Sequence, residues 1–144
     1  AWAFCVFEYA IERLYFPWLK GNFVFVIVGF FVAAFGQVIR TLAMYTAGSN
    51  FNHLIEEDSR HDHRMVDWGV YALFRHPSYF GWFWWTVAIQ VMLANPISLM
   101  GFSYVAWRFF KDRIEYEEGT LVEQFGEKYD KYRKTVPVGI PFIQ

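Results

Sequence analysis

Long apolar runs alternate with charged blocks along this chain, and each run predicts a helical element. The first run has no Asp, Glu, Lys or Arg between Lys20 and Arg40, and it continues past Arg40 to Tyr45. A bilayer core of about 30 Å is crossed by about 20 helical residues, so we expect a membrane helix over about 22–46. A buried strand and helix of a soluble protein is the alternative.

The second run is broken near its middle. The 32 residues between Arg75 and Arg108 carry no Asp, Glu, Lys or Arg, and Asn95–Pro96 interrupts them. Proline lacks the backbone N–H and disfavours helix at the preceding residue. We therefore expect a helical hairpin with arms at about 78–94 and 97–110. Each arm is barely long enough to cross a bilayer, so a tilted or shallow hairpin is possible, and one long kinked helix is the alternative.

Residues 1–19 are apolar but include Glu8, Glu12 and Arg13. They predict another membrane helix with a polar stripe, or a helix that lies against the bilayer surface. The chain begins without Met, within an apolar pattern, so we expect that further N-terminal helices precede it.

Two polar blocks, 48–77 and 111–144, flank the predicted hairpin and would therefore lie on the same side of the membrane. They hold nine of the 13 basic residues, namely Arg60, Arg64, Arg75, Lys111, Arg113, Lys128, Lys131, Arg133 and Lys134. Positive charge favours the cytosolic side. The expected fold is an all-α, polytopic membrane protein forming one domain over 1–144, with a cytosolic loop and a cytosolic C-terminal amphipathic helix.

Composition agrees with a membrane protein and excludes several classes. Aromatic residues make up 23% of the chain and charged residues 19%, whereas soluble domains carry about 25% charge. A net charge of −1 argues against nucleic-acid binding. The single cysteine, Cys5, excludes an intrachain disulfide framework. His61 and His63 lie close together, but no HExxH motif accompanies them, so we expect no metal site.

The C-terminal block places charged groups where they can act together. Arg113, Glu117 and Glu118 lie within about a turn of one helix, so a guanidinium and a carboxylate can face one site. Four apolar residues share a face of the same predicted helix: Ile114, Leu121, Phe125 and Tyr129. A solvated amphipathic helix with intrahelical ion pairs is the alternative.

Two further features suggest anion binding. Arg40 lies near the end of the first predicted membrane helix, where its guanidinium either clamps a carboxylate or phosphate or extends to the lipid headgroups. The segment 75–82, Arg-His-Pro-Ser-Tyr-Phe-Gly-Trp, enters the hairpin. Pro77 suits the first turn of a helix, whose free N–H groups can hold an anion. An ordinary helix start is the alternative for this segment.

Several motifs together resemble a known family. They are Gly-Val-Tyr-Ala-Leu-Phe-Arg-His-Pro-Ser-Tyr-Phe-Gly-Trp over 69–82, Asp-Arg-Ile-Glu-Tyr-Glu-Glu-x-x-Leu over 112–121, Phe-Gly-Glu-x-Tyr-x-x-Tyr over 125–132, and Val136–Pro137. The segment 49–53 and the Asn95–Pro96 break fit the same pattern. This set, covering about 49–143, resembles the isoprenylcysteine carboxyl methyltransferases. Phospholipid N-methyltransferases and, more loosely, sterol reductases share only the RHPxYxG and EExxL pair, and they remain alternatives together with a non-catalytic membrane module.

The resemblance implies methyl esterification of the C-terminal prenylcysteine of processed CaaX proteins, such as small GTPases, in the endoplasmic reticulum membrane. The implied methyl donor is S-adenosylmethionine, leaving S-adenosylhomocysteine, and the active site is expected to face the cytosol. No GxGxxG motif or alternating strand–helix pattern is present, so the donor site is not a Rossmann fold. The partners implied are the prenylated protein and membrane lipid, without nucleic acid.

The same resemblance implies the site residues. The donor would be held by Glu56, His63, Arg64, Met65, Val66, Tyr71, His76, Pro77, Ser78, Tyr79 and Glu117, with Glu118 as an alternative to Glu117. Glu56 departs from the family's usual Gln. Arg113 matches the substrate-side arginine, Arg40 is the natural second clamp, and Tyr79, Trp82 and Trp85 can line the cavity.

These residue types suit the expected chemistry. Methyl transfer from a sulfonium is an in-line displacement, and the attacking carboxylate, with a pKa of about 3.3–3.7, is ionised at pH 7 without a general base. The enzyme must orient donor and acceptor, an effect of about 7–11 kcal/mol in favourable cases, and must remove water from the carboxylate. We expect the prenyl chain to enter between helices from the membrane, and the donor to enter from the cytosol.

Overall fold

A computed structural model describes residues 2–48 and 65–144, and these residues form helices and connecting turns without strands. The elements are α1 (Trp2–Tyr15), α2 (Pro17–Lys20), α3 (Phe23–Ala47), the 3₁₀ turn η2 (Gly69–Ala72), α4 (Pro77–Met92), α5 (Pro96–Phe125) and α6 (Glu127–Thr135). The expected all-α fold is confirmed for this part of the chain.

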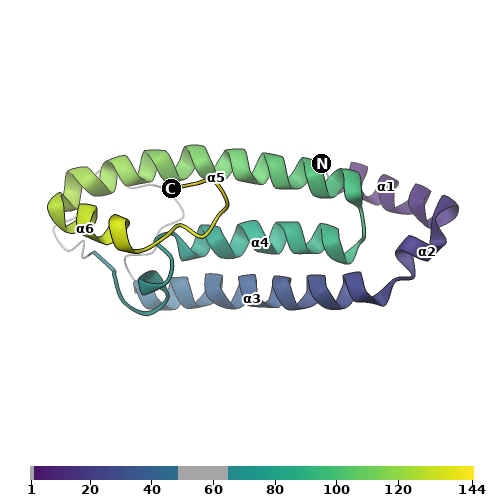
Figure 1. Cartoon of the computed structure of the whole chain (residues 1–144), viewed down its shortest axis with the longest axis horizontal. Helices are drawn as coiled ribbons and strands as arrows, with labels where there is room; N and C mark the ends of the chain where they lie inside the picture. Colours follow the sequence, from purple (N-terminus) through teal and green to yellow (C-terminus); the bar gives the residue numbers. More distant parts are fainter. Residues whose placement is uncertain (1, 49–64) are drawn as a thin grey trace.

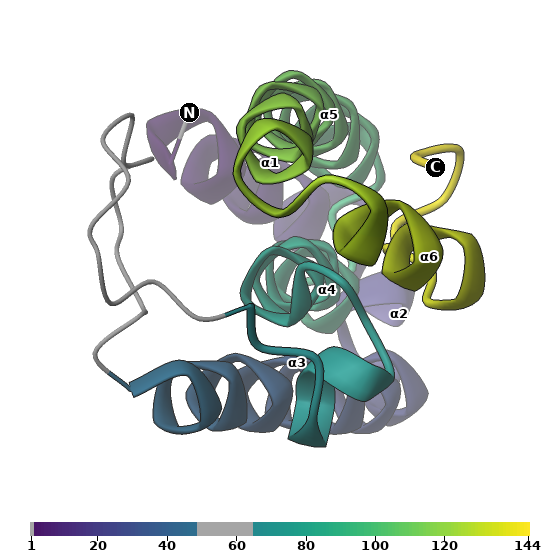
Figure 2. The same cartoon turned by 90° about the vertical axis from the view of Figure 1, so that its left-hand side faces the viewer.

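Three long helices, α3, α4 and α5, run alongside one another with α4 in the middle (Figure 1). The end-on view places α1 next to α5, whereas α6 and the C-terminus lie on the other side of α5 (Figure 2). The C-terminal end of α3, η2, the start of α4, the end of α5 and α6 all gather at one end of the molecule (Figure 1). That end carries the charged motifs.

Among the described helices, α3 alone is long and apolar enough to cross a membrane. Its first N–H groups are capped by Asn22, whose side chain accepts a 3.1 Å hydrogen bond from the backbone N–H of Val24. Gly36 and Gly81 bring α3 and α4 together, because a Cβ atom built on Gly81 would lie 2.3 Å from the Gly36 carbonyl oxygen.

The N-terminal segment is not one helix over 1–19 as predicted. It breaks at Phe16 (φ −130°, ψ 57°), because Pro17 disfavours helical backbone at the residue before it, and α2 follows as a single turn. Glu8 is buried, and its carboxylate accepts hydrogen bonds from the N–H groups of Ile97 (2.7 Å) and Ser98 (2.8 Å). One acidic member of the predicted polar stripe therefore caps α5.

The break between the two arms lies where the sequence predicts it, since α4 ends at Met92 and α5 begins at Pro96. The second arm, however, does not end near residue 110. It continues without a break into the predicted amphipathic helix and forms one helix of 30 residues. The i,i+4 ion pairs Arg108–Asp112 and Lys111–Glu115 connect its apolar and charged halves.

Ile114, Leu121, Phe125 and Tyr129 were predicted to share one helix face, and this prediction is wrong for Tyr129. Gly126 (φ 53°) ends α5, so Tyr129 belongs to α6. Ile114 and Tyr129 are nevertheless both buried, at 1% and 2% exposure. The chain after α6 folds back along the molecule as an extended segment, and Val138, Ile140 and Ile143 join the core formed with α4 and α5.

Candidate active site at the ends of α4 and α5

The start of α4 directs a histidine away from its own helix. Pro77 occupies the first turn, as predicted, and His76 precedes it without capping the helix through its side chain. Instead, the buried His76 ring faces α5. Its Nε2 lies 3.2 Å from Glu118 Oε1, and its Nδ1 lies 3.7 Å from Glu117 Oε2. One imidazole therefore contacts both adjacent carboxylates.

The two carboxylates have different environments. Arg75 donates a 2.9 Å hydrogen bond from Nε to Glu118 Oε1. Burial raises the pKa of the Glu118 carboxyl, but the hydrogen bond and charge of His76 and the Arg75 guanidinium outweigh burial, so the net pKa is lowered. Glu117 is more exposed, at 30% for its side chain, yet its Oε2 is buried and accepts no hydrogen bond within the described residues. Glu118 is thus engaged in an internal ion pair, whereas Glu117 interacts with the Tyr79 side chain and keeps one buried oxygen, Oε2, without a hydrogen-bond donor among the described residues.

Tyr79 connects His76 to Arg113. The rings of His76 and Tyr79 stack with centroids 5.6 Å apart and planes 11° from parallel. The Tyr79 hydroxyl accepts a 2.7 Å hydrogen bond from Arg113 Nε. The predicted donor-side and acceptor-side residues therefore meet at this tyrosine.

Arg40 faces α4 rather than extending past the end of its helix. Its guanidinium donates hydrogen bonds to the Ser78 hydroxyl (3.0 Å) and carbonyl oxygen (3.3 Å), and lies 4.9 Å from the centroid of the Trp82 ring. The close helix contact at Gly81 brings Arg40 there, because a Cβ atom on Gly81 would lie 2.9 Å from the Arg40 Cβ. Arg40 therefore contacts Ser78 and Trp82, which flank Tyr79 on α4.

Tyr71, in η2, connects this region to α3 and α6. Its hydroxyl donates a 3.5 Å hydrogen bond to the Ala43 carbonyl, and its own carbonyl accepts one from the Tyr132 hydroxyl at 2.5 Å. Burial, followed by the negative charge of Glu117, raises the pKa of Tyr71 to about 12. Tyr71 therefore stays neutral at physiological pH.

The remaining predicted donor residues divide into two groups. Met65 is buried, Val66 is partly buried and Pro77 is fully buried, so these three supply apolar surface. Glu56, His63 and Arg64 lie outside the described residues, and their expected roles remain predictions. Within the described residues, no group of three His, Cys, Asp or Glu side chains is placed to hold a metal ion.

Arg75 is part of the motif over 75–82, but the sequence predicts no site role for it. It is 8% exposed, and besides Glu118 it donates to the carbonyl oxygens of Arg133 (2.6 Å) and Val136 (3.0 Å). These partners follow it by 58 and 61 residues. The sequence shows only a positive charge directly before the His-Pro pair that starts a helix. An arginine at the membrane interface gives the same pattern, so this signal does not predict a buried role.

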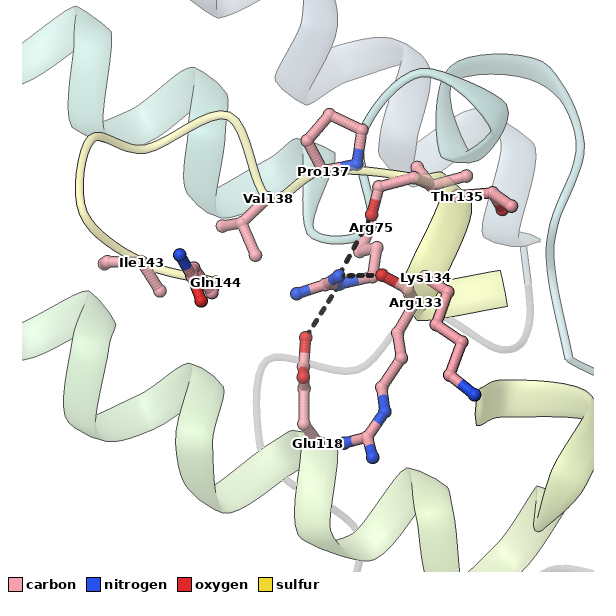
Figure 3. A pocket seen from close by; sticks show the side chains of 10 residues that line it. Arg75, Glu118, Arg133, Lys134, Thr135, Pro137, Val138, Ile143 and Gln144 are labelled. Atoms are coloured by element: carbon pink, nitrogen blue, oxygen red, sulfur yellow. Dashed lines mark hydrogen bonds and ion pairs between the residues drawn. The ribbon is translucent and has the colours of Figure 1, made fainter. Parts of the chain in front are cut away.

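A cavity of about 540 Å³ lies beside the Arg75–Glu118 pair, between that pair, α6 and the C-terminal segment (Figure 3). Its wall includes Arg133, Lys134 and Val138. Of the predicted donor-site residues that the structure describes, only Glu118 lines it. His76, Tyr79 and Arg113 do not line this cavity, although Glu118 connects it to His76.

Comparison with known proteins identifies the family. The sequence profile of the isoprenylcysteine carboxyl methyltransferase family matches residues 27–123. The chain belongs to this family. It is 47% identical over 95% of its length to a protein-S-isoprenylcysteine O-methyltransferase of Xenopus laevis, and 52% identical over 94% of its length to one of Dictyostelium discoideum. It covers 48% and 57% of those two proteins, so it spans about half the length of such relatives.

A solved structure supports the same assignment. The structure of a eukaryotic intramembrane Ras methyltransferase of the isoprenylcysteine carboxyl methyltransferase family matches 98% of this chain, with a TM-score of 0.95 and 44% sequence identity. The chain covers 50% of that protein. The family resemblance seen in the sequence motifs is therefore confirmed, and the helical arrangement is the family fold.

Proposed function

We propose that this protein methylates the C-terminal carboxylate of a prenylated cysteine, using S-adenosylmethionine. The observation that carries the proposal is the meeting of His76, Tyr79 and Glu117 with Arg113 at one end of α4 and α5. This arrangement brings a carboxylate and a guanidinium from α5 to one tyrosine on α4. The names of the relatives in this family agree with the reaction.

The residues present fit the proposed donor. Glu117 Oε2 is a buried carboxylate oxygen without a hydrogen-bond donor in the described part of the chain, so a bound ligand with N–H or O–H groups can satisfy it. The residues that would hold the donor are Met65, Tyr71, His76, Ser78, Tyr79 and Glu117, together with Glu56, His63 and Arg64 as expectations. When bound, S-adenosylmethionine supplies a methyl group activated by a sulfonium. Aromatic surface such as the Tyr79 ring is favourable next to such a cation.

The acceptor side consists of two arginines and needs no base. A C-terminal carboxylate is ionised at pH 7, since its pKa is about 3.3–3.7. Arg113 holds it next to Tyr79, and Arg40 supplies a second guanidinium from α3. Held between two guanidinium groups, the carboxylate is oriented and shielded from water while it stays ionised.

The membrane arrangement is also part of the proposal. We place α3 across the endoplasmic reticulum membrane and the hairpin of α4 and the apolar first half of α5 within it, with the candidate active site at the cytosolic side. The 16 residues of α4 rise about 24 Å, less than the bilayer core of about 30 Å, which favours a shallow hairpin. Such a hairpin brings the site close to the headgroups, where a prenyl chain enters from the lipid and the donor from the cytosol.

The test uses the protein in nanodiscs with methyl-radiolabelled S-adenosylmethionine. N-acetyl-farnesylcysteine and phosphatidylethanolamine are offered separately as acceptors. Base-labile label on farnesylcysteine, as expected for a methyl ester, would support the proposal. Label on the lipid amine instead would replace it with phospholipid N-methylation.

A further inference from the structure

The C-terminal tail, residues 136–144, is part of the core rather than a loose end. Side-chain N–H groups from three elements hold its backbone. Trp84 Nε1 donates to the Gly139 carbonyl (3.4 Å), Trp107 Nε1 donates to the Pro141 carbonyl (2.8 Å), and Arg75 donates to the Val136 carbonyl. The tail is therefore attached to α4, α5 and the segment before α4.

Apolar side chains hold the same tail in place. Val138, Ile140 and Ile143 are 1%, 3% and 8% exposed and pack in one cluster. The other buried members of that cluster are Phe83, Phe110 and Ile114, from α4 and α5. This packing holds the tail, and with it the Val136 carbonyl that Arg75 contacts.

Arg75 joins the tail to the candidate active site. Its buried guanidinium contacts Glu118 through Nε, and the Arg133 and Val136 carbonyls through a single terminal nitrogen (Figure 3). Its backbone N–H also donates to the Pro137 carbonyl at 3.0 Å. The planar fork of an arginine makes these contacts simultaneously, whereas a lysine ammonium is a single point charge that cannot reproduce the fork.

Glu118 extends the connection to His76. The same oxygen, Oε1, that accepts from Arg75 also lies 3.2 Å from His76 Nε2. Because an ionised carboxylate only accepts hydrogen bonds, we assign the proton to Nε2. This assignment fixes the ring with Nδ1 toward Glu117 Oε2 and its face against Tyr79. The ring orientation therefore depends on Glu118, which depends on Arg75, which depends on the tail.

We propose that Arg75 is a positioning residue of the donor site, and that the packed C-terminal tail, through Arg75 and Glu118, sets the affinity for the methyl donor by orienting His76. The inference rests on the proposed function, because it assumes that His76 and Glu117 contact the donor. The acceptor-side Arg113 is reached through Tyr79, whose ring packs against both His76 and the tail cluster. Arg75 itself contacts Glu118 and the tail, so replacing Arg75 is the change directed at the donor side.

The first experiment compares R75K with R108K in nanodiscs. Both variants replace arginine by lysine, but Arg108 forms an exposed ion pair on α5. Calorimetry with S-adenosylhomocysteine, which binds without turnover, gives the donor-site Kd, and initial rates give the acceptor KM. We expect R75K to weaken donor binding by about tenfold or more, with the acceptor KM within about twofold of the unaltered protein, and R108K to change neither. Equal Kd values for R75K and R108K would overturn the positioning role.

The second experiment tests the tail without altering Arg75. I140A and I89A remove the same atoms from two isoleucines, one in the tail and 3% exposed, the other partly buried near the end of α4 away from the site. At a temperature where both remain folded by circular dichroism, we expect only I140A to weaken S-adenosylhomocysteine binding. A similar Kd for the two variants would mean that the tail contributes stability alone, and would overturn its role in donor affinity.

The unaltered protein separates the two proposals. If it binds no S-adenosylhomocysteine while folded, the proposed function fails, and the inference fails with it. If it binds and transfers methyl groups but R75K and I140A behave as their controls, only the positioning inference fails.

Discussion

Arg113 on α5 donates a 2.7 Å hydrogen bond to the hydroxyl of Tyr79 on α4. The Tyr79 ring also stacks on His76, so this bond lies between the proposed donor side and the proposed acceptor side. Removing only the hydroxyl would leave the ring stack intact and remove the hydrogen bonds of Tyr79 with Arg113 and Glu117. The pair therefore offers a way to separate the two sides experimentally.

We expect Tyr79→Phe to lower kcat/KM for the farnesylcysteine acceptor by about tenfold, the effect of one lost hydrogen bond to a charged group. The hydroxyl also contacts Glu117, but donor-site Kd should change less, because the ring remains stacked on His76 and Glu117 Oε2 is still unpaired within the described residues. Steady-state kinetics and calorimetry measure both quantities. Tyr104→Phe, which removes a hydroxyl from an exposed tyrosine on α5, is the matched control. A larger effect on donor Kd than on the acceptor would contradict the arrangement.

Removal of Arg40 separates two reaction classes. Arg40→Ala should raise the acceptor KM for farnesylcysteine by about tenfold or more, because the guanidinium is proposed to hold the carboxylate. Gln37→Ala, one turn earlier on α3, is the control. An amine acceptor needs no carboxylate clamp, so an unchanged KM in Arg40→Ala would count against a carboxylate substrate at this position.

Glu118 predicts a pH dependence of stability. Its pKa is lowered in the folded protein, so its ion pair stabilises the fold above the unfolded carboxyl pKa of about 4.3. That contribution is lost as the pH falls through the lower folded value. The groups that face this carboxylate are Arg75, His76 and Tyr129.

Glu118→Gln removes the titrating group and keeps its shape. At pH 7 the variant should be less stable by about 2 kcal/mol, and the difference in Tm from the unaltered protein should shrink between pH 6 and pH 3.5. Thermal unfolding at several pH values measures this difference. A difference in Tm that stays constant over this range would show that Glu118 does not titrate with folding.

The contact between α3 and α4 predicts a clear steric effect. Gly81→Ala puts a Cβ atom 2.3 Å from the Gly36 carbonyl oxygen, so the helices must separate, at a cost of about 1–3 kcal/mol. Gly101→Ala, on α5, meets nothing within 4 Å and should be neutral or stabilising, because alanine favours helix over glycine by about 1 kcal/mol. Chemical unfolding in mixed micelles compares the two. Equal stability for both variants would show that the close approach does not exist.

The sequence predicts the elements of this fold better than their ends. The Asn95–Pro96 break and the apolar run of α3 are local signals, and both lie where the structure has them. The continuity of α5 was missed because hydropathy changes sharply near residue 110. Hydropathy reports the surroundings of a helix rather than its end, and the i,i+4 ion pairs Arg108–Asp112 and Lys111–Glu115 span that change. The packing of the tail into the core leaves no local signal, because Pro137, Gly139 and Pro141 are typical of loops whether they are buried or exposed.

The sequence likewise predicts part of the candidate site and misses the rest. The family resemblance carried by the motifs implies roles for His76, Tyr79, Arg113 and Glu117, and the structure brings these four residues together. They could not distinguish Glu117 from Glu118, since adjacent carboxylates look alike until their partners are known. Arg75 has partners 43 to 61 residues away in the chain, and a long-range contact of this kind leaves no local pattern.

The central claim is that Glu117 holds the donor and Arg113 holds the acceptor. The most direct test measures S-adenosylhomocysteine Kd and farnesylcysteine KM for Glu117→Gln and Arg113→Lys in the same nanodiscs. We predict a crossed result. Glu117→Gln raises Kd by about tenfold or more and leaves KM within about twofold, whereas Arg113→Lys raises KM and leaves Kd unchanged. If both variants change the same constant, or if Glu117→Gln changes KM and Arg113→Lys changes Kd, the assignment of the two sides is wrong.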